Sequence, residues 1–151
     1  MRSYLVQADL PMAYFMKQEL KLNTSGLYFD LQPIFHGLNT RFFAGIIKAH
    51  LRWGQRRKTL HSKRAIRLGS YHPTTKIITI NPCLDQAIVP TICVERILFH
   101  EMAHQYYPPK KSPSGKNLVH YREFYDFEQS YPYIKEADLW LKANLSRLLR
   151  Y

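Results

Sequence analysis

The sequence predicts an α+β domain in which a small, mainly antiparallel three-stranded sheet packs on one side of a helical layer. Helical spacing of apolar residues before and after a central run of short β-branched segments is the first observation behind this prediction. The second is a hairpin pattern in the central region, and the third is a His-Glu-x-x-His pentad near the end of a long helical segment. The length of 151 residues suits one domain with its own core.

Two helices are expected before the first strand. A helix over about 4–20 should pack outside the core, and the polar stretch 23–26 ends it, so that residues 1–26 form an N-terminal helical extension to a domain over 27–151. Pro33 is tolerated in the first turn of the second helix. Its core face carries apolar residues at helical spacing, namely Ile34, Phe35, Leu38, Phe42 and Phe43.

The central region predicts three strands. The first covers 46–53 and ends at Gly54, and a basic loop over 55–64 follows it. Segments 65–71 and 76–80 alternate or are β-branched around a turn at 72–75, which predicts a hairpin.

Three helices complete the chain. Pro90 suits the first turn of a helix that continues over 91–106 and is ended by Pro108 and Pro109. A polar loop is expected over 110–116. Two further helices are expected over about 118–130 and 134–149, separated by Pro132.

Residues 100–104 form the pentad His-Glu-Met-Ala-His, which is the strongest functional signal in the chain. Residues four apart lie on one face of a helix, so His100 and His104 can reach one ion, and zinc is the usual occupant of such a site. Glu101 can then accept a proton from water that the metal activates. The sequence therefore predicts one bound Zn²⁺ with Glu101 as a catalytic base.

A catalytic zinc needs a third protein ligand and one open position. His120 is the preferred candidate, because on a helix from 118 it shares its face with Phe124 and could be directed at the metal. Glu123 or Glu128 would instead give a site of two His and one Glu, and a carboxylate is an acceptable zinc ligand.

The net charge of +11 predicts attraction to polyanions, with nucleic acid the first candidate. Solvated loops that aid solubility are the alternative reading of the same residues. The candidate nucleic-acid contacts are Arg56, Arg57, Lys58, Lys63, Arg64, Lys110 and Lys111.

Cellular location is predicted from what the sequence lacks. The apolar runs are too short to span a membrane, and the N-terminal segment has no apolar signal-peptide region. Cys83 and Cys93 do not make a secreted disulfide framework. We therefore expect a cytoplasmic protein that does not contact membranes.

The chain resembles the SprT-like (Spartan-type) zinc metalloprotease family in an ordered series of motifs. The Pro-rich, basic loop between His104 and His120 departs from the family pattern. The matching segments are 38–45 (LNTRFFAG), 51–54 (LRWG), 67–71 (RLGSY), 76–81 (KIITIN), 99–104 (FHEMAH) and 120–124 (HYREF).

The resemblance implies a zincin-like metalloprotease domain with zinc held by His100, His104 and His120 and with Glu101 as the base. It also implies a strand at the rim of the cleft that pairs with an extended substrate, for which Leu68, Gly69 and Ser70 are the candidates. The substrate would be a protein or peptide, and the Spartan resemblance suggests proteins bound or crosslinked to DNA.

Peptide hydrolysis also needs a donor to the oxyanion, for which Tyr121, Arg122 and Tyr131 are candidates. The alternative function is a basic nucleic-acid-binding protein in which a structural or regulatory zinc site takes no part in proteolysis. A structural zinc domain would need a closed fourth position, and the spacing offers no fourth His or Cys.

Overall fold

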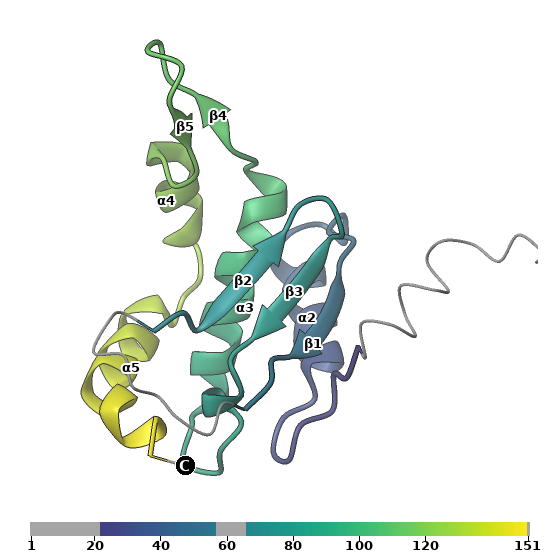
Figure 1. Cartoon of the computed structure of the whole chain (residues 1–151), viewed down its shortest axis with the longest axis vertical. Helices are drawn as coiled ribbons and strands as arrows, with labels where there is room; N and C mark the ends of the chain where they lie inside the picture. The colour runs from purple at the N-terminus through teal and green to yellow at the C-terminus, as the bar shows by residue number, and fades with distance from the viewer. Residues whose placement is uncertain (1–21, 57–65, 151) are drawn as a thin grey trace, which may run out of the picture.

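The computed structural model describes residues 22–56 and 66–150 of the chain. These residues form an α+β fold in which helices pack on a three-stranded sheet and a separate two-stranded hairpin stands at one end (Figure 1). The helix predicted over 4–20 lies outside the described residues. In chain order the elements are α2 (Leu31–Phe42), β1 (His50–Trp53), β2 (Gly69–His72), β3 (Ile77–Ile80), the 3-10 turn η1 (Pro82–Leu84), α3 (Thr91–Tyr106), β4 (Lys110–Lys111), β5 (Asn117–Leu118), α4 (Arg122–Glu128) and α5 (Ile134–Leu148).

The three-stranded sheet is mixed, with the order β1-β3-β2. β2 and β3 form the predicted antiparallel hairpin, in which Gly69 lies opposite Ile80 and His72 opposite Ile77. β1 pairs with β3 in parallel, so the prediction of a mainly antiparallel sheet was wrong for this pair. The pairing of β1 with β3 joins segments far apart in the sequence, and no local pattern reveals its direction.

The first strand is shorter than predicted, because the backbone of Ile47 forms its hydrogen bonds with the side chain of Asn39 and not with a neighbouring strand. Asn39 of α2 accepts a hydrogen bond from the Ile47 N–H and donates one to the Ile47 carbonyl, both in the protein interior. Residues 46–49 therefore connect α2 to the sheet, and β1 begins only at His50.

The central helix is α3, which packs against α2, α4, α5 and the strands β2 and β3. Its apolar side chains supply the middle of the core. Fully buried members on this helix are Cys93, Val94, Leu98, Phe99, Met102 and Ala103. The prediction of a helix over 91–106 is confirmed, and the backbone of Pro90 precedes it in an extended conformation.

The segment that enters α2 is held by a buried carboxylate. Asp85, just after η1, accepts hydrogen bonds from the backbone N–H groups of Leu27, Tyr28 and Phe29 at 2.6, 2.9 and 3.1 Å. Gly26 lies so close that a Cβ there would meet the carboxylate at 2.4 Å. This contact fixes residues 26–29 against the loop between β3 and α3.

The chain after α3 differs from the prediction in two ways. β4 and β5 form an antiparallel hairpin inside the region expected to be a loop and the start of a helix, and Gly115 adopts a positive φ of 81° in its turn. The next helix, α4, begins at Arg122 and not at 118. The reason is that the pairing of Lys110 with Leu118 keeps the chain extended there.

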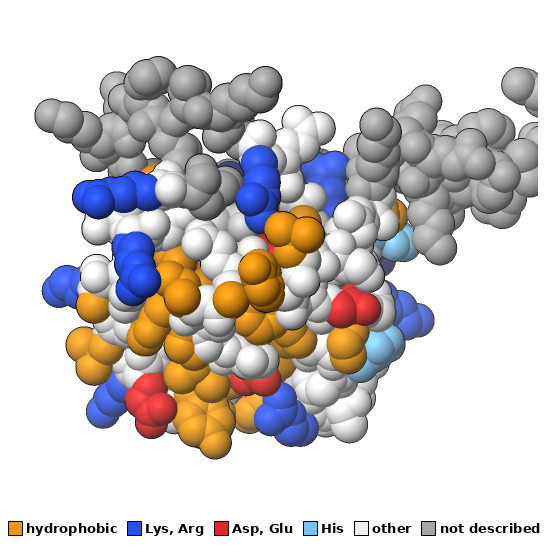
Figure 2. Space-filling model, turned by 90° about the horizontal axis from the view of Figure 1, so that it is seen from below, with side chains coloured by type: hydrophobic (Ala, Val, Ile, Leu, Met, Phe, Trp, Pro, Cys, Tyr) orange, Lys and Arg blue, Asp and Glu red, His pale blue; other side chains and the backbone are white. Residues whose placement is uncertain are grey.

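The hairpin lies at one end of the molecule, and the opposite end is partly apolar. The hairpin β4–β5 extends beyond the sheet and the helices in Figure 1. The view from the opposite end shows hydrophobic side chains gathered across the middle of that face, with Lys and Arg around them (Figure 2).

Within the described residues, no helix is long and apolar enough to cross a membrane.

Candidate metal centre

Two of the three predicted ligands come from one face of α3. The Nε2 atoms of His100 and His104, one helical turn apart, are separated by 3.2 Å. A helix aligns such a pair without help from other elements.

The third ligand candidate, His120, lies between β5 and α4. The prediction that it would lie on a helix was wrong. Its Nε2 atom is 3.1 Å from the Nε2 atom of His104. The hairpin reverses the chain after α3, and this reversal returns His120 to the end of the helix that carries the other two.

The three histidines could together hold a metal ion, and their spacing is compatible with zinc. Their ligand atoms all lie within 4.8 Å of one another. Nitrogens bound tetrahedrally to zinc at 2.0–2.1 Å would be separated by about 3.3 Å. The two measured separations of 3.2 and 3.1 Å are close to this spacing. Among the residues that the structure describes, the group consists of three imidazoles and no fourth protein ligand, which is the donor set of a site with an open position.

The two carboxylates considered as alternative ligands lie elsewhere. Glu123 is an exposed residue whose oxygens are both 3.2 Å from Nζ of Lys110. Glu128 is buried and contacts His100 on its other ring nitrogen, Nδ1, at 2.5 Å. Neither belongs to the group of possible ligands that the structure brings together.

The phenyl ring of Phe124 packs against all three histidines of the site. This fully buried ring, in the first turn of α4, lies with its centroid 5.2, 4.8 and 5.1 Å from those of His100, His104 and His120. One side chain thus contacts all three imidazoles and limits how far each can rotate. The sequence motif His-x-x-x-Phe at 120–124 reflects this packing.

His120 is fixed by its neighbour Tyr121. The Tyr121 hydroxyl donates to the carbonyl oxygen of Pro108 at 2.9 Å, and Nζ of Lys110 lies 4.2 Å from the centre of the Tyr121 ring. These contacts join the chain before the hairpin to the chain after it. They hold the segment that carries His120 beside α3.

Burial sets the electrostatics of the site. Desolvation, strengthened by the charges of the other two histidines, lowers the pKa of His104 to about 4, and desolvation also lowers the pKa of His120. Both imidazoles are therefore suited to the neutral state that a metal ligand requires. Burial raises the pKa of Glu101 to about 7, against a smaller opposing effect of His100.

The Glu101 side chain lies against the strand β2. A Cβ built on Gly69 would meet Oε1 of Glu101 at 2.8 Å and Cγ2 of Ile97 at 2.7 Å. Glycine at this position is what lets the strand approach α3 so closely. The approach brings the candidate base next to the edge of the sheet.

Of the three residues predicted to bind substrate, Gly69 and Ser70 belong to β2 and Leu68 directly precedes it. In the part of the chain that the structure describes, β2 lies at an edge of its sheet. The carbonyl of Leu68 accepts a hydrogen bond from the backbone N–H of Asn81. Along an antiparallel pair of strands, residues alternate between those whose backbone groups bond to the partner strand and those whose backbone groups point away from it. The backbone groups of Leu68 and Ser70 therefore face β3, whereas those of Gly69 and Tyr71 face away from it.

A pocket of about 320 Å³ opens beside the histidines, and two kinds of residue line it. Its apolar walls come from both sides of the site and are formed by Tyr71, Pro73, Pro108, Pro109 and Val119. Its polar lining residues are Arg67, Glu101, His104, Gln105 and His120.

Sequence reasoning missed Arg67 and Gln105 as site residues. Arg67 had been given no role in the site, although it opens the segment 67–71 and lies two residues before Gly69. Gln105 donates hydrogen bonds to the Tyr71 hydroxyl at 3.0 Å and the Lys48 carbonyl at 2.8 Å, so it ties α3 to the sheet. Its place directly after His104 was the available signal.

The three residues suggested as oxyanion donors do not line this pocket. Tyr121 donates its hydroxyl to Pro108, as described above. Arg122 is 90% exposed and lies near Asp126. Tyr131 is buried, and its hydroxyl contacts Glu95 and the carbonyl of Ile92.

The residues suggested to contact nucleic acid divide into three sets. Arg57, Lys58, Lys63 and Arg64 lie outside the described residues. Arg56 is exposed in the segment that follows β1. Lys110 and Lys111 form β4 and are exposed, and Lys110 also pairs with Glu123 and Tyr121.

No protein-family model, curated protein or solved structure matches the chain. The interpretation of the site therefore depends on its own geometry and on the chemistry of its residues.

Proposed function

We propose that the protein is a zinc-dependent endopeptidase of the SprT-like type. The observation that carries this proposal is the convergence of the His100, His104 and His120 Nε2 atoms beside a pocket that Glu101 also lines. Three imidazole nitrogen donors with a nearby carboxylate are the parts that metal-assisted hydrolysis needs.

A zinc ion held by the three histidines would supply Lewis acidity, which activates water and polarises a carbonyl group. Glu101 has the role of general base and then general acid, taking a proton from water and delivering it to the leaving nitrogen. Its buried position beside Gly69 raises its pKa, which favours a group that must both accept and donate protons near neutral pH.

The substrate is proposed to bind as an extended segment along β2. The backbone groups of Gly69 and Tyr71 face away from β3, so they are available to form a further antiparallel or parallel pairing. Such a segment would pass directly beside Glu101. Arg67, two residues before Gly69, supplies a guanidinium group to the lining of the pocket. We assign it, in place of Tyr121, Arg122 and Tyr131, as the donor to a developing oxyanion.

The role of Glu101 is tested with Glu101→Gln, which keeps the side-chain volume and removes the base. We expect zinc content equal to that of the wild type and hydrolysis of denatured casein reduced at least 10²-fold. Proteolysis at the wild-type rate in this variant would exclude the mechanism.

The ligand set is tested by measuring zinc per chain in purified wild type, His120→Ala and Glu123→Ala. We expect one zinc in the wild type and in Glu123→Ala, and a large loss of affinity in His120→Ala. Both substitutions remove an exposed side chain near β5 and α4, so Glu123→Ala is a matched control. Loss of zinc with Glu123 alone would move the third ligand to that carboxylate.

A second candidate function is the binding of nucleic acid. It is compatible with proteolysis, because a protease that binds DNA could act on proteins associated with that DNA. The observation that favours it is the exposed basic hairpin, in which Lys111 on β4 and Lys116 directly before β5 are both exposed. The double variant Lys111→Glu and Lys116→Glu leaves Lys110 to support Tyr121. We expect weaker DNA binding and a shallower dependence on salt concentration. Lys135→Glu with Lys142→Glu on α5 makes the same change of charge and is the control.

A further inference from the structure

Glu128, in the last turn of α4, is a buried carboxylate that the proposed chemistry does not use. Only 3% of the residue is exposed. Its Oε1 atom lies 2.5 Å from Nδ1 of His100 and 2.5 Å from Nη1 of Arg96. A buried carboxylate with two such partners has a defined position, because leaving either partner without it would strand a polar group in the interior.

The contact with His100 determines which ring nitrogen carries the proton. A neutral imidazole has one N–H and one bare nitrogen, and only the bare nitrogen can bind a metal. The carboxylate accepts a hydrogen bond from Nδ1–H, so Nε2 is left without a proton. Nε2 is the atom of His100 that lies 3.2 Å from Nε2 of His104.

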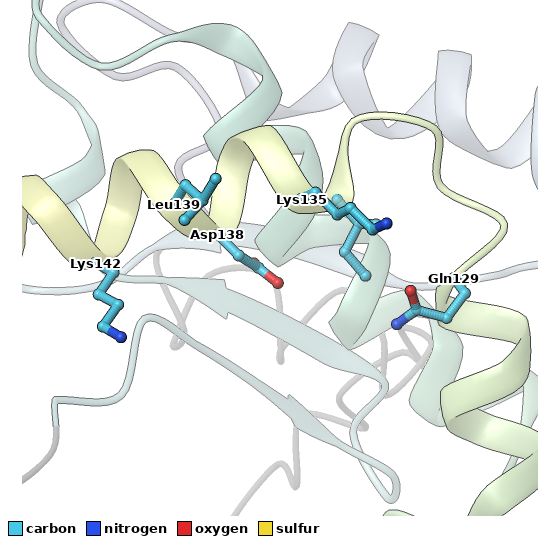
Figure 3. Close-up of a pocket in the computed structure, with 6 residues that line it drawn as sticks. Gln129, Lys135, Asp138, Leu139 and Lys142 are labelled. Atoms are coloured by element: carbon cyan, nitrogen blue, oxygen red, sulfur yellow. The ribbon is translucent and has the colours of Figure 1, made fainter.

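Arg96 holds Glu128 in place from α3 and is itself held from α5. Its Nε atom donates to Asp138 at 2.9 Å, and only 12% of its side chain is exposed. Asp138 projects from α5 into the hollow that Gln129, Lys135, Leu139 and Lys142 line (Figure 3). A continuous series of charge-assisted contacts thus runs from α5 through Arg96 and Glu128 to His100.

We propose that Glu128 is a positioning residue of the metal centre, which fixes the tautomer and ring orientation of His100 and is itself anchored through Arg96 to Asp138 on α5. This inference rests on the proposed function in so far as His100 is a metal ligand. It assigns α5, which contributes no residue to the group of possible ligands, a part in supporting that group.

The first test measures zinc affinity by competition with a chromophoric chelator. Removal of a carboxylate that supports a metal-bound histidine lowers affinity by about 10–100-fold. We expect a loss in this range for Glu128→Gln and a smaller loss for Asp138→Asn, which keeps the shape of the side chain. Glu123→Gln, on the same helix but exposed, should bind zinc as the wild type does. The absorption spectrum of Co²⁺ in the same variants reports whether the ligand geometry has changed.

The second test needs no substitution and therefore does not depend on the folding of a variant. Long-range ¹H–¹⁵N NMR of the metal-free wild type at pH 8 should show a proton on Nδ1 of His100. A proton on Nε2 with a bare Nδ1 would overturn the proposal, and so would wild-type zinc affinity in a folded Glu128→Gln. The result is separate from the test of Glu101, because the tautomer is read without metal and without substrate.

Discussion

Gly69 and Glu101 approach each other so closely that β2 and α3 leave no space for a methyl group between them. A Cβ on Gly69 would lie 2.8 Å from Oε1 of Glu101 and 2.7 Å from Cγ2 of Ile97. The position of the candidate base is therefore set partly by the absence of a side chain on the neighbouring strand. None of the three histidines is among the atoms nearest to that Cβ. A substitution at Gly69 can therefore test the base separately from the metal ligands.

Gly69→Ala should displace the Glu101 carboxylate and leave the metal site intact. Ile97 is β-branched and has little rotational freedom on a helix, so the carboxylate will move first. We expect zinc affinity within about twofold of wild type and a rate of peptide hydrolysis at least 10-fold lower. Zinc competition and a casein assay on the same preparation measure both quantities.

Gly37→Ala is the control for Gly69→Ala. Gly37 lies within α2, and the nearest atom to a Cβ there is the end of the Arg41 side chain at 3.8 Å. We expect unchanged hydrolysis and stability higher by about 0.5–1 kcal/mol, because alanine suits a helix better than glycine. Equal activity in the two glycine variants would show that the contact with Glu101 has no catalytic importance.

Phe124→Ala should weaken zinc binding as well as the fold, because this ring packs beneath all three histidines. Replacing a buried phenylalanine by alanine costs about 3–5 kcal/mol in the free energy of unfolding. Urea unfolding in the presence of a chelator gives the stability, and chelator competition gives the affinity. Tyr125→Ala removes the adjacent, half-exposed ring and should cost less than about 1 kcal/mol.

Substitutions of Asp85 should give graded losses of stability. Oδ2 accepts from Leu27, and Oδ1 accepts from Tyr28 and Phe29. Asp85→Asn can retain the two bonds to one oxygen and should lose about 1–2 kcal/mol, whereas Asp85→Ala should lose about 3 kcal/mol or more. Equal losses by urea unfolding would contradict the arrangement of the three bonds.

The stability of the protein should fall as the pH rises above 9. Burial raises the pKa of the Cys83 and Cys93 thiols from 9.0 to about 11, and both residues are fully buried. Between these values the unfolded chain has lost thiol protons that the folded protein keeps. The unfolded state then binds fewer protons, so stability decreases with pH.

The size of this effect is about 2 kcal/mol per thiol at pH 10.5. Urea unfolding of wild type and of the double variant Cys83→Ala and Cys93→Ala at pH 8 and 10.5, under reducing conditions, measures it. We expect the stability advantage of the wild type to shrink between the two pH values. An unchanged difference would mean that the thiols ionise equally in both states.

The parts of the fold that the sequence predicted best are those that depend on local spacing. α3 is bounded by Pro90 and Pro108, and the pentad within it places His100 and His104 on one face wherever the helix packs. The hairpin of β2 and β3 follows from short strands around one turn. These features need no knowledge of distant residues.

The parts that could not be predicted depend on contacts between distant segments. The direction of β1 beside β3 depends on how the chain crosses between them, and the start of α4 depends on the pairing of Lys110 with Leu118. The position of Glu128 requires α4 to lie against α3, because only this packing brings it to Nδ1 of His100. The sequence showed a carboxylate near the site but not which ring nitrogen it would meet.

The bond between the Tyr121 hydroxyl and the Pro108 carbonyl joins the two chain segments at the base of the hairpin β4–β5. The rings of His104 and Phe124, which contact His120, belong to the helices before and after the hairpin. The turn around Gly115 lies at the tip of this hairpin, and a Cβ there would meet nothing within 4 Å. The hairpin could therefore gain or lose residues at its tip without disturbing the contacts that place His120, which makes the tip a tolerant position for insertions and sequence changes.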